Sequence, residues 1–292
     1  SLRRIGRGFI VSGLCILGGR PKVGKSWLSL QIAQAVGAGG KALGYDVPQG
    51  KALVLALEDP RRSRQARMRM QSWPLGSPVE FVTIGGFLDN LGDLRNGGGA
   101  KLARKIEAED FTLCVVDTLS RSVNGDQNDV SEMTAALTPL ADIAGRLNVA
   151  IVLIDHLRKN IGEHFDAVAD ILGSTAKAAV PDTLWALYRR KGKAVAVLAV
   201  TGRDVVPQQL ELAFDQMTGC WQSEGRVGTL KMTENRQAIL DALLDLGPCS
   251  ERDITAAVGQ DRGNTYKRLQ DLVSTGQVRK KRDGGVVQYM LA

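Results

Sequence analysis

The sequence predicts an α/β fold with a mainly parallel sheet and later antiparallel hairpins, followed by a small domain of three helices and a β-hairpin. Up to about residue 225, apolar runs of strand length alternate with helical patterns, the order expected when helices connect parallel strands. Beyond residue 233, three helical patterns precede two β runs that flank the turn sequence Arg282-Asp-Gly-Gly285. We therefore expect one domain at residues 1–225, a linker at 226–233 and a second domain at 234–292.

The predicted strands of the first domain are mostly continuous apolar runs, as expected for parallel strands that helices cover on both faces. These strands are Gly13–Leu17, Ala52–Leu57, Val79–Ile84, Thr112–Val116 and Asn148–Asp155. The helical patterns between them are Ser26–Val36, Ser63–Gln71, Leu102–Glu107 and Asp129–Arg146. Short β runs with tight connections then predict antiparallel hairpins at Thr183–Arg190, Ala194–Thr201, Gln208–Phe214 and Cys220–Gln222.

The order of elements in the second domain is typical of a winged helix-turn-helix. Its predicted elements are helices at Glu234–Asp245, Ser250–Val258 and Arg262–Thr275 and strands at Val278–Lys281 and Val286–Leu291. Basic residues concentrate on the third helix and in the hairpin, and the candidates for DNA contacts are Arg262, Lys267, Arg268, Lys280 and Lys281. Such a helix would enter a major groove while the wing contacts phosphates, so we expect duplex DNA as a partner. Winged helices also dock proteins, and that alternative stays open.

Composition excludes several other classes of protein. Of 292 residues, 44% are hydrophobic and 24% charged, which excludes a largely disordered chain. With 38 Lys+Arg against 31 Asp+Glu, the net charge is +7, a weak indication of nucleic-acid binding. The apolar runs are too short to span a membrane and no export signal is visible, so we expect a cytoplasmic protein without membrane contact. Four scattered cysteines and two histidines argue against a disulfide framework and a zinc site.

The segment from Gly19 to Ser26, GRPKVGKS, fits the P-loop pattern G-x-x-x-x-G-K-[ST] between a predicted strand and a predicted helix. The glycines let backbone N–H groups approach phosphates, Lys25 reaches the β- and γ-phosphates, and the Ser26 hydroxyl is a ligand for Mg²⁺. The cofactors predicted are therefore ATP and Mg²⁺. The residues predicted to bind the nucleotide are Gly19, Val23, Gly24, Lys25, Ser26 and Trp27.

Polar residues at the ends of three other predicted strands would meet this loop. Asp117 ends the apolar strand LCVVD, the form of a Walker B element, and would hold Mg²⁺ together with Ser26. Glu58 follows another strand and is our candidate for the carboxylate that activates the attacking water. His156 follows a third strand and could sense the γ-phosphate. Each of these residues could instead simply end or support its strand.

Together, the motifs GGRPKVGKSWLSLQ, ALEDP, LCVVDTLSR, VLIDH, GSTAK and VTGRD resemble RecA-like P-loop ATPases of the RepA-type replicative helicase group of mobile elements. The resemblance spans about Phe9 to Trp221. It implies a RecA-type core, a homo-hexameric ring with ATP between neighbours, and single-stranded DNA in the central channel. By motif match, Arg67 lies near the active carboxylate and Arg203 is an arginine finger, although Arg203 could also be an ordinary turn residue.

The polar segment that follows the strand with His156 is expected to line that channel, with Arg158 and Lys159 as the phosphate contacts. A solvated loop is the alternative. The first functional hypothesis is an ATP-hydrolysing DNA motor, a replicative helicase. The alternatives are a RecA-like recombination or loading ATPase, and an ATP-switched regulator that binds DNA through the winged helix.

Overall fold

The structure is a computed structural model that describes residues 4–5, 10–157, 167–171, 174–189, 195–203, 205–226, 229–259, 261–274, 277–283 and 286–291. The chain divides into two compact units, Ser1–Glu224 and Gly225–Ala292. No helix within the described ranges is both long and apolar enough to cross a membrane.

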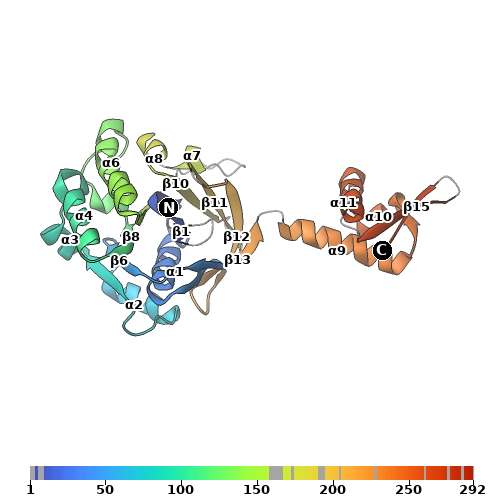
Figure 1. Cartoon of the computed structure of the whole chain (residues 1–292), viewed down its shortest axis with the longest axis horizontal. Helices are drawn as coiled ribbons and strands as arrows, with labels where there is room; N and C mark the ends of the chain where they lie inside the picture. Colours follow the sequence, from blue (N-terminus) through green and yellow to red (C-terminus); the bar gives the residue numbers. More distant parts are fainter. Residues whose placement is uncertain are drawn as a thin grey trace. The chain divides into compact units, whose positions relative to one another are not determined.

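A nine-stranded sheet forms the framework of the first unit (Figure 1). In spatial order its strands are β13 (Cys220–Arg226), β12 (Gln208–Asp215), β11 (Val195–Gly202), β10 (Thr183–Arg189), β3 (Gly13–Gly19), β9 (Ala150–Asp155), β8 (Phe111–Asp117), β6 (Lys51–Ala56) and β7 (Val79–Thr83). The six strands from β10 to β7 are parallel, whereas β11 pairs antiparallel with both β10 and β12. The predicted α/β fold, mainly parallel with antiparallel strands, is therefore confirmed.

Both faces of the sheet are buried, which explains why its strands are continuously apolar. Along β3, Leu14 and Ile16 belong to one core while Cys15 and Leu17 belong to the other, as the two-residue period of a strand requires. The first core is covered by α3 (Ile84–Asn90), α4 (Gly99–Ala108) and α6 (Val130–Leu147), and the second by α1 (Lys25–Ala38). Figure 1 shows α3, α4 and α6 grouped together and apart from α1.

The remaining elements of the first unit are short, apart from α2. They are β1 (Arg4–Ile5), β2 (Ile10–Val11), β4 (Gly40–Ala42), β5 (Tyr45–Val47), α2 (Arg61–Met70), the kinked turn η1 (Leu94–Gly98), α5 (Leu119–Ser122), α7 (Ala167–Asp170) and α8 (Ala176–Ala179). The sequence did not predict the β4–β5 hairpin, α3 or η1. Each is short and rich in glycine or charge, so its periodicity is weak.

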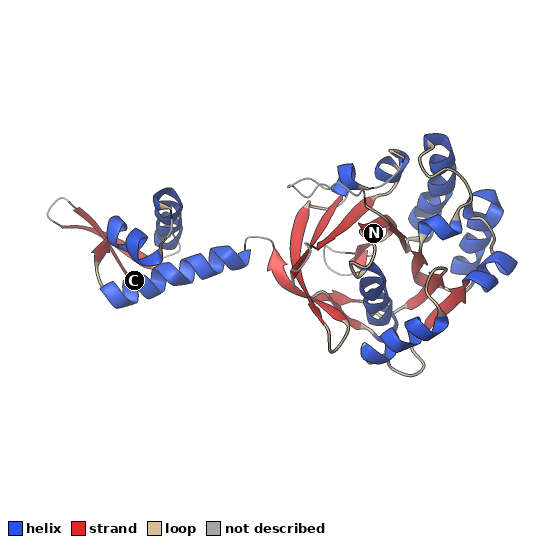
Figure 2. Cartoon of the chain, turned by 180° about the vertical axis from the view of Figure 1, so that it is seen from behind, coloured by secondary structure: helices blue, strands red, loops and turns tan. Residues whose placement is uncertain are grey.

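The second unit packs three helices against a three-stranded sheet (Figure 2). Its elements are α9 (Thr229–Leu246), β14 (Cys249–Ser250), α10 (Glu251–Val258), α11 (Arg262–Ser274), β15 (Val278–Asp283) and β16 (Val286–Leu291), with β16 in the centre of the sheet. Ile239, Ile254, Leu269 and Tyr289 are buried in a core of its own. Helix α9 begins at Thr229, within the stretch 226–233 that was predicted as a linker. The run TLKMT contains no glycine or proline that would stop a helix.

Candidate functional site

The loop between β3 and α1 has the geometry of a phosphate-binding loop. Gly24 has a left-handed backbone (φ 111°), and a Cβ there would lie 2.7 Å from Cζ2 of Trp221, so conformation and space both require glycine. A Cβ on Gly19 would lie 2.9 Å from Cδ of Lys25. Val23, within the loop, is buried. Helix α1 begins at Lys25, so its free N–H groups and positive dipole end face the loop.

Lys25 is buried and folded back onto its own loop. Its Nζ donates hydrogen bonds to the carbonyl oxygens of Gly19 (2.7 Å) and Arg20 (3.1 Å). Burial lowers the pKa of Lys25, and the negative charges of Asp117, Asp155 and Glu58 oppose that decrease. A phosphate oxygen could replace the two carbonyl acceptors, so this ammonium group is positioned for an anion.

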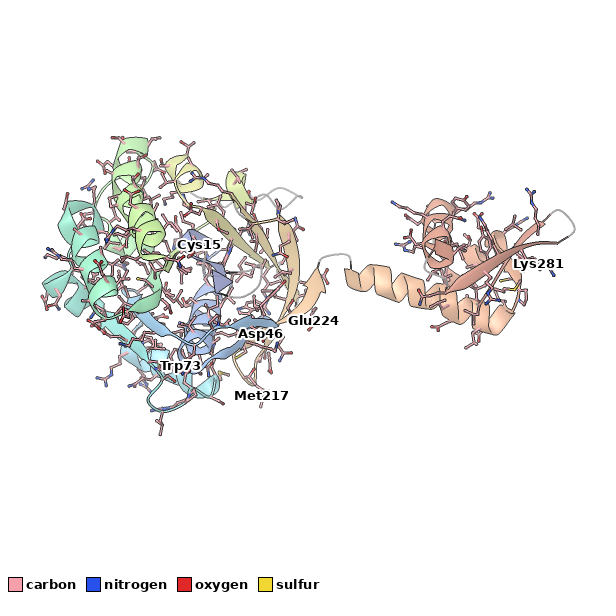
Figure 3. All side chains as sticks on the ribbon, viewed as in Figure 1. Cys15, Asp46, Trp73, Met217, Glu224 and Lys281 are labelled. Atoms are coloured by element: carbon pink, nitrogen blue, oxygen red, sulfur yellow. The ribbon has the colours of Figure 1, made fainter. Side chains whose placement is uncertain are left out.

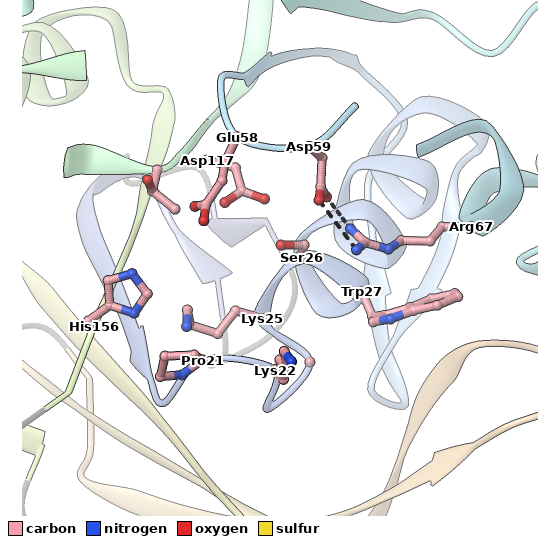
Figure 4. Close-up of a pocket in the computed structure, with 12 residues that line it drawn as sticks. Pro21, Lys22, Lys25, Ser26, Trp27, Glu58, Asp59, Arg67, Asp117 and His156 are labelled. Carbon is pink, nitrogen blue, oxygen red and sulfur yellow. Dashed lines mark hydrogen bonds and ion pairs between the residues drawn. The ribbon is translucent and has the colours of Figure 1, made fainter. Parts of the chain in front are cut away.

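Two carboxylates on neighbouring parallel strands face the loop. Asp117 ends β8 opposite Ala56 of β6, and its carbonyl oxygen accepts hydrogen bonds from the N–H groups of Leu57 (2.8 Å) and Glu58 (3.2 Å). These bonds fix the Glu58 backbone beside Asp117. Burial raises the pKa of Asp117 to about 6, against the lowering effect of its hydrogen bond with Ser26. Figure 4 shows the side chains of Glu58, Asp117 and Ser26 close together, with Lys25 beside them.

Glu58, Asp117, Ser26 and Lys25 line a cavity of about 450 Å³, a size within the range of small-ligand pockets. Its other lining residues are Pro21, Lys22, Gly24, Trp27, Asp59, Arg67, Thr118 and His156. Within the described residues, no group of three or more His, Cys, Asp or Glu side chains could hold a metal alone. The hydroxyl of Ser26 and the carboxylate of Asp117 are oxygen donors, which suits Mg²⁺ that arrives with phosphates and keeps part of its water.

The predicted site residues Arg67 and His156 also line this cavity. Arg67 forms an ion pair with Asp59, with 3.4 Å between Nη2 and Oδ1, and its guanidinium lies 5.4 Å from the ring centroid of Trp27. His156 directly follows β9, and its buried Nδ1 has no hydrogen-bond partner among the described residues. An unsatisfied ring nitrogen at the wall of a cavity can accept a ligand contact.

Arg203 does not line this cavity. In β10, Thr183 pairs with Gly202 of β11 and with Cys15 of β3, whereas the P-loop begins at the far end of β3. Arg203 is exposed there, and its Nη2 donates to the carbonyl oxygen of Ala179 (2.8 Å). A contact between Arg203 and a nucleotide would therefore require a second copy of the chain.

Several contributors to the site were not predicted. Asp59 was not among the candidate residues, although the acidic pair Glu58-Asp59 was visible in the sequence. The indole Nε1 of Trp221 donates to the carbonyl oxygen of Gly24 (3.1 Å), and Gln31 exchanges two 2.8 Å hydrogen bonds with the Trp221 backbone. Trp221 stands about 190 residues from Gln31, and no short-range pattern signals such a pairing.

The second unit holds a basic cavity of about 680 Å³ between α10, α11 and the β15–β16 hairpin. Its lining includes three candidate DNA contacts, Arg262, Lys280 and Lys281. It also includes Arg282 of the predicted hairpin, and Arg252 and Tyr266, which were not candidates. Lys281 is exposed on β15 (Figure 3). Lys267 and Arg268 lie on α11 but do not line the cavity, and Arg268 is half-buried. The predicted channel residues Arg158 and Lys159 lie outside the described residues.

Comparison with known proteins places this geometry in context. Residues 1–162 match the family described as an AAA domain. A solved structure titled "The Structure Of A DnaB-Like Replicative Helicase And Its Interactions With Primase" is 14% identical in sequence, with a TM-score of 0.56. The match covers 72% of this chain and 58% of that chain, so the similarity is one of fold over part of the larger protein. No curated protein matches the sequence.

Proposed function

Because the chain belongs to the AAA domain family, we propose that it is an ATP-dependent DNA motor, and more specifically a hexameric replicative helicase of a mobile element. The observation that carries this proposal is the single cavity that a P-loop lysine, a hydroxyl and two strand-end carboxylates share. The fold similarity to a DnaB-like replicative helicase supports the motor over other uses of a P-loop.

In the proposed reaction each side chain has a separate task. Lys25 leaves its two carbonyl acceptors and binds the β- and γ-phosphates, while Ser26 and Asp117 would hold Mg²⁺. Mg²⁺, when bound, supplies positive charge to the phosphate oxygens. Glu58 accepts the proton of the attacking water as the water oxygen bonds to the γ-phosphorus and the bond to ADP breaks. His156 would contact the γ-phosphate and respond to its loss.

The position of Arg203 supports a site completed by a neighbouring subunit. Arg203 stands away from its own P-loop on an exposed turn, so we propose that it enters the cavity of the next copy and stabilises charge on the transferred phosphoryl group. Equal mixing of Lys25→Ala and Arg203→Ala proteins tests this. In mixed assemblies an intact Lys25 would meet an intact Arg203, and hydrolysis should recover above that of either variant alone.

A matched control is Arg146→Ala, which removes an exposed arginine of α6 whose Nη1 lies 3.5 Å from Glu107. This variant should hydrolyse ATP like the wild type. No recovery in the Lys25→Ala and Arg203→Ala mixture would contradict the assignment of Arg203 to a neighbour's site.

Single-stranded DNA in the channel, contacted by Arg158 and Lys159, belongs to the same proposal. The decisive measurement is the rate of ATP hydrolysis with and without single-stranded DNA, with Lys25→Ala as the inactive control. A motor should be stimulated, and unwinding of a forked duplex separates a helicase from a loading ATPase. Hydrolysis indifferent to DNA, with specific duplex binding lost on deletion of residues 230–292, would favour the regulator instead.

The basic cavity of the second unit supports duplex binding by a winged helix-turn-helix as an additional proposed function. Lys280 pairs with Tyr289 and shares its face of the hairpin. Lys280 and its neighbour Arg279 are both exposed, but only Lys280 lines the cavity. Lys280→Ala should weaken binding of the full chain to duplex DNA. The plot of the logarithm of the association constant against the logarithm of salt concentration should become less steep by about 0.9. Arg279→Ala is the matched control, and equal effects of the two substitutions would contradict this binding face.

A further inference from the structure

A buried ion pair lies beside the P-loop and takes no part in the chemistry proposed above. Lys177 of α8 has a side chain only 1% exposed, and its Nζ donates to Oδ2 of Asp155 (2.7 Å) and to Oε1 of Gln127 (2.8 Å). The side chain of Asp155 is 3% exposed. A buried carboxylate and a buried ammonium are each costly without a partner, so the two groups depend on each other.

Asp155 is placed where its charge bears on the nucleotide site. It ends β9 directly opposite Gly18 of β3, one residue before the P-loop begins, and it directly precedes His156 at the cavity wall. Figure 4 shows His156 and Lys25 on the same side of that cavity. The negative charge of Asp155 is among those that raise the pKa of Lys25, so the two groups are within electrostatic reach.

We propose that Lys177 is a positioning residue that neutralises Asp155 and so leaves Lys25 available to the triphosphate. This inference deepens the proposed function and rests on it. With Lys177 present, Asp155 pairs with Lys177 while Lys25 donates to the carbonyl oxygens of Gly19 and Arg20. Without Lys177, the buried Asp155 would attract Lys25 and repel the phosphates of the nucleotide.

The contacts of Gln127 fix the geometry of the pair. Gln127 stands in the loop before α6, and its carbonyl oxygen accepts a 3.0 Å hydrogen bond from the N–H of Ser174. The hydroxyl oxygen of Ser174 accepts a 3.1 Å bond from the N–H of Ala176, next to Lys177. Lys177 is therefore anchored from both sides, by its own helix and by the loop that follows α5.

The test compares Lys177→Met, Asp155→Asn and the double variant in the full chain. We would measure the Kd of a hydrolysis-resistant ATP analogue and of ADP with Mg²⁺, and check folding by circular dichroism and thermal unfolding. Lys177→Met should weaken analogue binding about tenfold, the order of effect that one uncompensated charge near a partly buried site produces, and weaken ADP binding less. The double variant, with neither charge, should return to within about threefold of the wild type.

The double variant leaves neither charge buried alone, so it keeps the inference falsifiable if a single variant does not fold, and a Kd for the analogue about tenfold above that of the wild type would then overturn it. Asp155→Asn removes the negative charge alone, so its Kd for the analogue should equal that of the wild type or be lower. Weakening by about tenfold in Asp155→Asn, or a double variant no better than a folded Lys177→Met, would overturn the role of Lys177. If wild type does not bind the analogue, or binds it no better than Lys25→Ala does, the proposed function falls as well. If the wild type binds the analogue normally but the three variants do not show the expected differences in Kd, the inference about Lys177 is overturned and the proposed function stands.

Discussion

Because the pKa of Asp117 is raised, we predict that nucleotide binding changes with pH near pH 6, a higher pH than is usual for the titration of a carboxylate. Burial raises this pKa to about 6, and a proton on the carboxyl group competes with Mg²⁺. The apparent affinity for the Mg²⁺-nucleotide complex should fall by the factor 1 + 10^(6−pH). That factor is negligible at pH 8, about 2 at pH 6 and about 11 at pH 5.

The assay is a titration with a fluorescent, hydrolysis-resistant ATP analogue at saturating Mg²⁺ between pH 5 and pH 8. Asp117→Asn is the control, because its profile contains the titration of the nucleotide itself but not that of the carboxyl group. The ratio of the wild-type affinity to the Asp117→Asn affinity, plotted against pH, should therefore bend near pH 6. A ratio that stays flat down to pH 5 would refute the reasoning.

The raised pKa of Asp117 also makes the free energy of unfolding depend on pH. The folded value of about 6 lies above the ordinary 3.8, so the stabilisation from Asp117 is complete below about pH 4 and is lost as the pH rises through 6. The difference corresponds to about 3 kcal/mol. Without nucleotide, the free energy of unfolding of Asp117→Asn, measured by denaturant titration, should thus exceed that of the wild type at pH 8 by up to this amount. At pH 5 the difference should be about half as large. A less stable Asp117→Asn at pH 8 would contradict this.

Two further predictions concern packing. Gly24→Ala combines a left-handed backbone with a Cβ 2.7 Å from the Trp221 ring, and should cost at least about 1–2 kcal/mol in urea denaturation. Gly85→Ala in α3, with open space around its Cβ, should be neutral or slightly stabilising, and equal effects would argue against the clash. In the second unit, Ile254→Ala should cost about 2–5 kcal/mol because the side chain is fully buried, whereas Leu244→Ala, at an exposed position, should change little in the same measurement.

The parts of the site that consecutive residues build could be predicted from sequence. The P-loop needs glycines, a lysine and a serine at set spacing after an apolar strand, and the structure places Gly24, Lys25 and Ser26 in that geometry. Asp117 and Glu58 were predictable because each ends an apolar strand, and the carboxyl ends of parallel strands share one edge of a sheet. The alternation of side chains between the two cores along β3 likewise follows from local backbone geometry.

Only the tertiary structure decided which distant residues meet. Strand order places β9 beside β3 and so brings Asp155 next to the P-loop, and Lys177 and Gln127 reach it from two separate connections. The antiparallel direction of β11 puts Arg203 at the opposite end of the sheet from Lys25. Hydrophobic periodicity reports which residues are buried but not which strands are neighbours, because many strand orders bury the same apolar faces equally well. The sequence thus determined the chemistry available to the cavity, and the packing of its sheet determined which charges act on it.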